Sequence, residues 1–226
     1  MRWPVLRRND SAVGSGTVAL IAPAPPRYGA WAAILSGLAT LLMLTTAVLS
    51  ARLQLGNTFS VVVLALMALI VVVALTLRIR LRPHQPTLGL VAAAIAALSA
   101  VVVGAAHILN MSGMSSPAEF NTLGEGIGPA GIGTWLLLAN YVAWRSGMLP
   151  RMLPLVGLIA GAGYLTSGIG ALIRGPASEG ATNTLSTVGP LGIFLVYPVW
   201  AVWLGLSMWR TRAPVGAPPQ VARRLL

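Results

Sequence analysis

The chain contains 226 residues, of which 56% are hydrophobic and 8% are charged, and its formal net charge at neutral pH is +11. A water-soluble domain of this length could not bury so large an apolar fraction. The composition therefore excludes an ordinary soluble protein and predicts membrane spans. The chain contains no cysteine, which excludes disulfides, thiol catalysis and cysteine-based metal or cluster sites.

A basic segment rich in proline and glycine, residues 1–27, opens the chain. Its apolar patch, Val18–Ala22, is shorter than the core of about 7 to 15 apolar residues that a secretory signal needs. We therefore predict a flexible cytoplasmic tail here.

Six apolar runs follow, each close to the length of about 20 residues with which a helix crosses a hydrocarbon core. They cover residues 29–50, 59–77, 88–109, 127–144, 152–173 and 188–209. The fourth run is the least apolar, because Pro129 and several glycines interrupt its start and Asn140 follows. We predict an all-α bundle of six transmembrane helices over residues 28–210, followed by a disordered cytoplasmic tail over residues 211–226.

The distribution of charge predicts the orientation of these helices. Most arginines precede the first run or follow the second, fourth and sixth runs. The connectors on the opposite side hold only Arg52 and Arg174, together with the glutamates Glu119, Glu125 and Glu179. Because positively charged short loops stay in the cytoplasm during insertion, we predict that both termini are cytoplasmic.

The net positive charge raises the alternative of nucleic-acid binding. The arginines are, however, spread over four separate segments next to the ends of the predicted spans. This pattern favours contact with anionic lipid headgroups, and we predict no nucleic-acid partner.

Small residues recur at the spacing that lets membrane helices pack closely. Gly29, Ala33 and Gly37 lie four residues apart in the first run, and Gly157 and Gly161 do so in the fifth. Since lipid provides no hydrophobic drive for helices to associate, these faces predict close packing within the chain.

The predicted spans contain no Asp, Glu or Lys, and one histidine, His107, lies near the end of the third. If that helix continues, His107, Met111 and Met114 share one face at spacings of four and three residues. Imidazole and thioether groups can ligate haem iron, and imidazole alone can ligate the magnesium of a chlorin. The alternative is a histidine that only makes hydrogen bonds at a helix end. We predict no other metal site and no other cofactor.

A transporter would instead need a path through the bundle. Four residues with polar groups or helix-distorting geometry are candidates for it: Asn140, Tyr197, Pro198 and Trp200. The alternative for the two aromatic residues is packing against neighbouring helices. The connectors 110–126 and 174–187, rich in Ser, Thr, Asn and Gly, are a second region in which a ligand could bind.

The turn between the fourth and fifth runs resembles that of a bacterial family of multi-pass membrane proteins catalogued only as a domain of unknown function. The resembling residues follow the pattern Tyr-x-x-x-Arg-Ser-Gly-x-x-Pro-Arg and a later Gly-Tyr pair: Tyr141, Arg145, Ser146, Gly147, Pro150, Arg151, Gly163 and Tyr164. The resemblance implies a multi-pass helical fold in a bacterial cytoplasmic (inner) membrane, and it implies no activity.

The sequence shows no Ser/His/Asp set, phosphate-binding glycine loop or paired-metal spacing, so we predict that the protein is not an enzyme. The first functional hypothesis is an accessory or structural subunit that binds other membrane protein subunits. The alternatives are a small-molecule transporter or permease, and a haem- or chlorin-binding subunit that uses His107.

Overall fold

The computed structural model describes residues 27–53, 57–174 and 184–210, and these residues contain helices and no strand. The elements in chain order are α1 (Arg27–Leu53), α2 (Thr58–Leu81), α3 (Pro86–Met111), α4 (Pro117–Phe120), the π-helix η1 (Asn121–Ile127), α5 (Gly128–Ser146), α6 (Met152–Arg174), α7 (Thr184–Leu191), the π-helix η2 (Gly192–Val196) and α8 (Tyr197–Arg210). The all-α prediction is therefore confirmed for this part of the chain. Of the predicted tails 1–27 and 211–226, residues 1–26 and 211–226 lie outside the described residues, as does Glu179, whereas Arg27 begins α1.

Five stretches of helix are long and apolar enough to cross a membrane. They are Arg27–Leu49, Thr58–Leu81, Pro86–Met111, Met152–Ile173 and Val188–Arg210. Each overlaps one of the six predicted spans. The fourth predicted span is also a helix, α5, but it is not among these five.

The position of α5 in the bundle explains its lower apolarity. This helix packs against α3 and α6, and its buried residues include Trp135, Leu136 and Asn140. A helix surrounded by protein can carry glycine and asparagine, because neighbouring helices rather than lipid meet its polar groups. At its C-terminus, Gly147 adopts a left-handed backbone conformation with φ of 63°, and a short turn then leads to α6.

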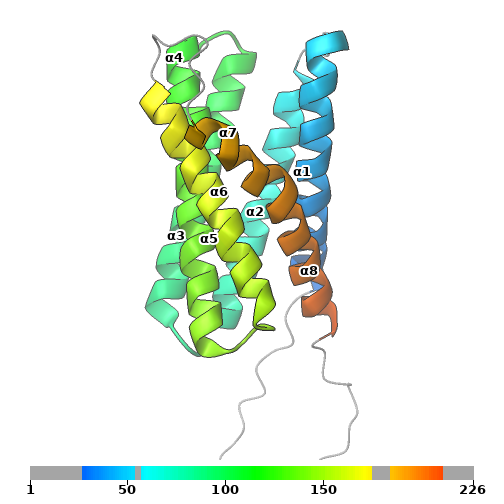
Figure 1. The fold of residues 1–226 in the computed structure, drawn as a ribbon, viewed down its shortest axis with the longest axis vertical. Helices are drawn as coiled ribbons and strands as arrows, with labels where there is room; N and C mark the ends of the chain where they lie inside the picture. Colours follow the sequence, from blue (N-terminus) through cyan, green and yellow to red (C-terminus); the bar gives the residue numbers. More distant parts are fainter. Residues whose placement is uncertain (1–26, 54–56, 175–183, 211–226) are drawn as a thin grey trace, which may run out of the picture.

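The start of α1 and the end of α8 lie at the same end of the bundle, which we call the terminal end (Figure 1). The rings of Trp31 and Trp209 meet there edge to face, with their centroids 4.9 Å apart. The short helix α4 lies at the opposite end, which we call the α4 end.

The last segment, from α7 through η2 to α8, runs diagonally across the bundle (Figure 1). At the α4 end it contacts α6, and at the terminal end it contacts α1. Both contacts are close: a methyl group on Gly163 of α6 would lie 2.5 Å from the Cα atom of Gly192, and one on Gly205 would lie 2.6 Å from the carbonyl oxygen of Ala30. Toward the α4 end, this segment packs against α6 and no longer against α1. Space therefore remains between α1 and α6 at that end.

Candidate functional site

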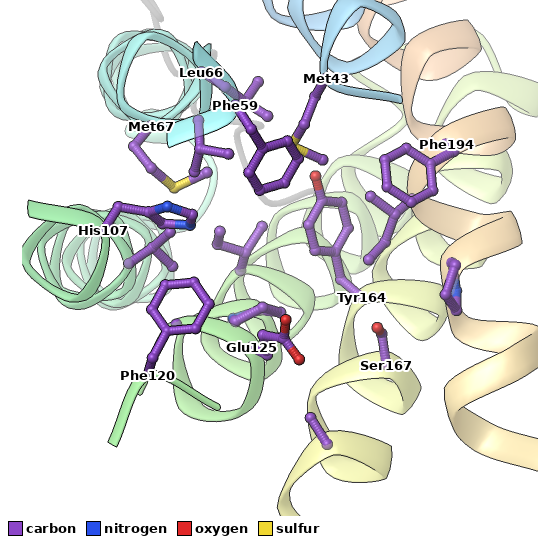
Figure 2. Close-up of a pocket in the computed structure, with 18 residues that line it drawn as sticks. Met43, Phe59, Leu66, Met67, His107, Phe120, Glu125, Tyr164, Ser167 and Phe194 are labelled. Atoms are coloured by element: carbon purple, nitrogen blue, oxygen red, sulfur yellow. The ribbon is translucent and has the colours of Figure 1, made fainter. Parts of the chain in front are cut away.

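A cavity of about 270 Å³ occupies this space, and Figure 2 shows the side chains around it. Residues from α1, α2, α3, α4, η1, α5, α6, α7 and η2 line it: Met43, Phe59, Val63, Leu66, Met67, Val103, His107, Phe120, Gly124, Glu125, Pro129, Ile132, Tyr164, Ser167, Ala171, Pro190, Ile193 and Phe194. Its volume is near the lower end of the range of about 300 to 1,000 Å³ that is typical of small-molecule sites. Walls that are mostly apolar and carry a few polar groups are also typical of such sites.

Tyr164 of α6 brings an unusual polar group to this cavity. Its side chain is only 4% exposed, and its hydroxyl has no hydrogen-bond partner among the described residues. Figure 2 shows the hydroxyl pointing away from α6, toward Met43. Nearly all buried hydroxyl groups are hydrogen-bonded, since burial without a partner costs about 1 to 3 kcal/mol. Because Tyr164 also lines the cavity, this hydroxyl is a polar group that a bound ligand or an ordered water would satisfy.

Glu125 comes to the cavity from η1. This segment has π-helical geometry, and at its end the N–H of Gly128 bonds to the carbonyl oxygen of Leu123, five residues back. Pro129, which has no N–H of its own, follows directly. Figure 2 shows the carboxylate between Phe120 on one side and Tyr164 and Ser167 on the other. The side chain is exposed, so the carboxylate lies where water reaches the cavity.

The capped helix α4 holds Phe120 next to η1. The Ser116 hydroxyl accepts a hydrogen bond from the N–H of Glu119 at 3.2 Å, and the Glu119 carboxylate accepts one from the N–H of Ser116 at 2.8 Å. This capping box satisfies two N–H groups that would otherwise lack partners. These hydrogen bonds lower the pKa of Glu119. The cap is therefore complete above the ordinary pKa of a glutamate and is lost as the pH falls through the lowered value.

His107 of α3 also faces the cavity and is 5% exposed. Its Nδ1 atom lies 3.0 Å from the Ser60 hydroxyl oxygen of α2 and forms a hydrogen bond with it. The ring of Phe120 packs edge to face against the imidazole at 5.0 Å, and Phe59 lies 5.9 Å away on a tilted plane. One of the two imidazole nitrogens therefore already has a hydrogen-bond partner within the bundle. The aromatic neighbours fix the orientation of the imidazole ring.

The structure does not gather the predicted cofactor ligands around one cavity. Met111 ends α3 and does not line the cavity, and Met114 is 75% exposed beyond the helix. The methionine beside His107 is instead Met67 of α2 (Figure 2). No group of three or more histidine or acidic side chains that could hold a metal ion occurs in the described ranges. A haem or chlorin on His107 stays a prediction.

Asn140 and Trp200, two of the four predicted path residues, join α5 to α8. The Trp200 Nε1–H donates to the Asn140 side-chain oxygen at 3.0 Å, and the Asn140 amide nitrogen donates to the carbonyl oxygen of Leu136 at 2.8 Å. Asn140 is 2% exposed and Trp200 is fully buried. Both partners of this hydrogen bond are therefore satisfied within the bundle.

Tyr197 and Pro198, the other two path residues, are buried at the start of α8. The Tyr197 hydroxyl donates to the Ser36 oxygen of α1 at 3.1 Å, and its ring lies edge to face against Tyr164 at 5.5 Å. None of the four predicted path residues lines the cavity. They form a closely packed layer between the cavity and the terminal end, and Tyr164 touches this layer from the cavity side.

Two copies of a five-residue motif border the cavity, and neither was recognised in the sequence. Residues 128–132 read Gly-Pro-Ala-Gly-Ile and residues 189–193 read Gly-Pro-Leu-Gly-Ile. In each copy the proline and the isoleucine line the cavity. The glycines of the two motifs let α5, α7 and η2 approach neighbouring helices. A search for short repeats would have found this signal.

These features define a multi-pass helical membrane protein with a small cavity in one half of its bundle. The chain belongs to the family described as Domain of unknown function (DUF4386), whose model matches residues 32–207. The predicted resemblance to a family of unknown function is confirmed at this level. No curated protein and no solved structure matches the chain significantly.

Proposed function

We propose that this protein is a transporter of a small, largely apolar molecule and that the cavity is its binding site. The observation that supports this proposal most directly is the unpartnered Tyr164 hydroxyl at the wall of a cavity between the helices. The two π-helical segments add to it, because non-α backbone at membrane depth commonly occurs next to substrate sites. Both segments line the cavity, η1 with Glu125 and η2 with Phe194.

The packed layer of Asn140, Trp200, Tyr197 and Pro198 has a role in this proposal. It closes the cavity toward the terminal end, and a transport cycle has to open it. In this proposal the four residues block the transport path. The ligand binds on the side of them that faces the α4 end, against Tyr164.

The test is binding and flux by the purified full chain. We expect small apolar molecules with one polar group to raise its melting temperature in nanodiscs, and the best of them to enter proteoliposomes. Ser167→Phe fills the cavity and should abolish both effects. Thr45→Phe adds the same ring at an exposed position of α1 and should change neither. Equal binding and flux by the two variants would show that the cavity is not the site.

We further propose six spans with both termini in the cytoplasm of a bacterial cell. This places the α4 end outside and the terminal end inside. The cysteine-free chain allows a direct test with single cysteines that react with a membrane-impermeant maleimide. Ser116→Cys should be labelled on intact spheroplasts, whereas Gln85→Cys and Met152→Cys should be labelled only after permeabilisation. Labelling of Ser116→Cys and Met152→Cys from the same side would show that α5 does not cross the membrane.

Two alternatives from the sequence have tests of their own. Purification from native membranes in mild detergent would reveal stable partners if the protein is an accessory subunit. An absorption spectrum of the same sample would show a Soret or chlorin band if His107 holds a pigment, and that band should disappear in His107→Ala.

A further inference from the structure

We propose that the cavity selects a small lipophilic cation, such as an aralkyl amine or a quaternary ammonium compound. This inference rests on the proposed binding site and adds the chemical class of its ligand. Three features of the cavity wall carry it: the charge of its polar groups, the nature of its apolar groups and the position of its unpartnered hydroxyl.

The charge at the cavity wall is negative. Of the described residues that line the cavity, Glu125 is the only one with a carboxylate, and none is an arginine or a lysine. The chain as a whole carries a net charge of +11, but its arginines lie in segments next to the ends of the predicted spans, so Glu125 and His107 are the described lining residues with an acidic or basic side chain. A carboxylate at the exposed edge of an apolar cavity attracts a cation, and the attraction strengthens as the apolar body of a bound cation displaces water from between the two charges.

The apolar walls are rich in aromatic rings. Phe59, Phe120, Tyr164 and Phe194 come from α2, α4, α6 and η2, and they surround the space shown in Figure 2. The negative face of an aromatic ring attracts a cation within about 6 Å, and rings that surround quaternary ammonium groups are a common use of this interaction. A neutral ligand of the same shape would gain the apolar contact without the cation–π attraction.

The Tyr164 hydroxyl completes the site. Its oxygen can accept a hydrogen bond from a protonated amine or donate one to a polar atom of the ligand. Ser167 lies one turn further along α6 and also lines the cavity. The wall therefore offers a carboxylate, aromatic faces and hydroxyl oxygens, all of which suit a cation with an apolar body.

The test compares two probes of nearly equal shape, benzyltrimethylammonium and neutral neopentylbenzene, in which carbon replaces the nitrogen. Saturable binding of each probe, in labelled form, is measured on the full chain in phosphatidylcholine nanodiscs, and neopentylbenzene is also tested as a competitor of the cation. We expect the cation to bind, and we expect Glu125→Gln to raise its dissociation constant roughly tenfold. Glu119→Gln is the matched control, because it removes a nearby carboxylate outside the cavity and glutamine still serves in a capping box.

The outcomes separate this inference from the proposed function. If neopentylbenzene competes as tightly as the cation and Glu125→Gln has no effect, the cation selectivity is wrong. Two cavity-filling variants from different helices, Ser167→Phe and Met43→Trp, then decide the rest. Loss of binding in both would keep the cavity as the site, and unchanged binding in both, or no saturable binding of either probe, would overturn the proposed function as well.

Discussion

Replacing Tyr164 by phenylalanine should leave the folded protein as stable as the native chain or more stable by up to about 1 kcal/mol, while weakening ligand binding two- to tenfold. The substitution removes only the hydroxyl, which is buried without a hydrogen-bond partner among the described residues. Losing an unsatisfied buried group relieves its desolvation cost. A ligand that bonds to this hydroxyl loses a hydrogen bond worth about 0.5 to 1.5 kcal/mol. Chemical unfolding in detergent and the binding assay above measure the two effects.

Tyr197→Phe is the matched control for this prediction. The two tyrosine rings contact each other edge to face, but the Tyr197 hydroxyl donates to Ser36 at 3.1 Å. Removing it should therefore destabilise the bundle by about 1 kcal/mol. If Tyr164→Phe destabilises the protein as much as Tyr197→Phe does, the Tyr164 hydroxyl has a partner within the bundle and the argument for a ligand there is wrong.

The helical fold was predictable because its main signal is local. A run of about 20 apolar residues is visible in the sequence whatever the rest of the chain does, and each of the six predicted runs is helical over most of its length. The sequence did not predict the change to π geometry at Gly192–Val196 or at Asn121–Ile127. Both changes precede a proline, but glycine contacts with other helices also shape these segments, and such contacts are not encoded in hydropathy.

The site was predictable only in part, because it depends on contacts between helices far apart in the sequence. The sequence singles out His107 as the one histidine within a predicted span, and it does line the cavity. Its neighbours were expected at helical spacing in its own segment. The structure instead places Ser60 and Met67 of α2 around it, since α2 and α3 pack side by side. Helical periodicity cannot identify partners from another helix.

The cavity itself follows from the diagonal course of the last segment. Glycine contacts hold this segment to α6 at the α4 end and to α1 at the terminal end, and the cavity lies toward the α4 end, where the segment no longer packs against α1. This geometry gives the adjacent residues Gly163 and Tyr164 a physical reason. Gly163 permits the close contact with η2, and Tyr164, the next residue, faces the cavity that this contact creates.

Gly163→Ala should therefore destabilise the bundle by about 3 kcal/mol, at the upper end of the usual cost of overpacking. The added methyl group would lie 2.5 Å from the Cα atom of Gly192 and 3.0 Å from the carbonyl oxygen of Gly189. Both neighbours are backbone atoms, so α7 and η2 would have to move away from α6 as a unit. We expect a lower melting temperature in nanodiscs, together with loss of ligand binding as the cavity changes shape.

Gly104→Ala is the control, because a methyl group there would meet only the Leu64 Cδ2 atom at 3.6 Å, an ordinary contact. Alanine is also favoured over glycine within a helix by roughly 0.5 to 1 kcal/mol, so this variant should be as stable as the native chain or slightly more stable. If Gly163→Ala has the same melting temperature as Gly104→Ala and binds ligand normally, the contact between α6 and η2 does not set the shape of the cavity.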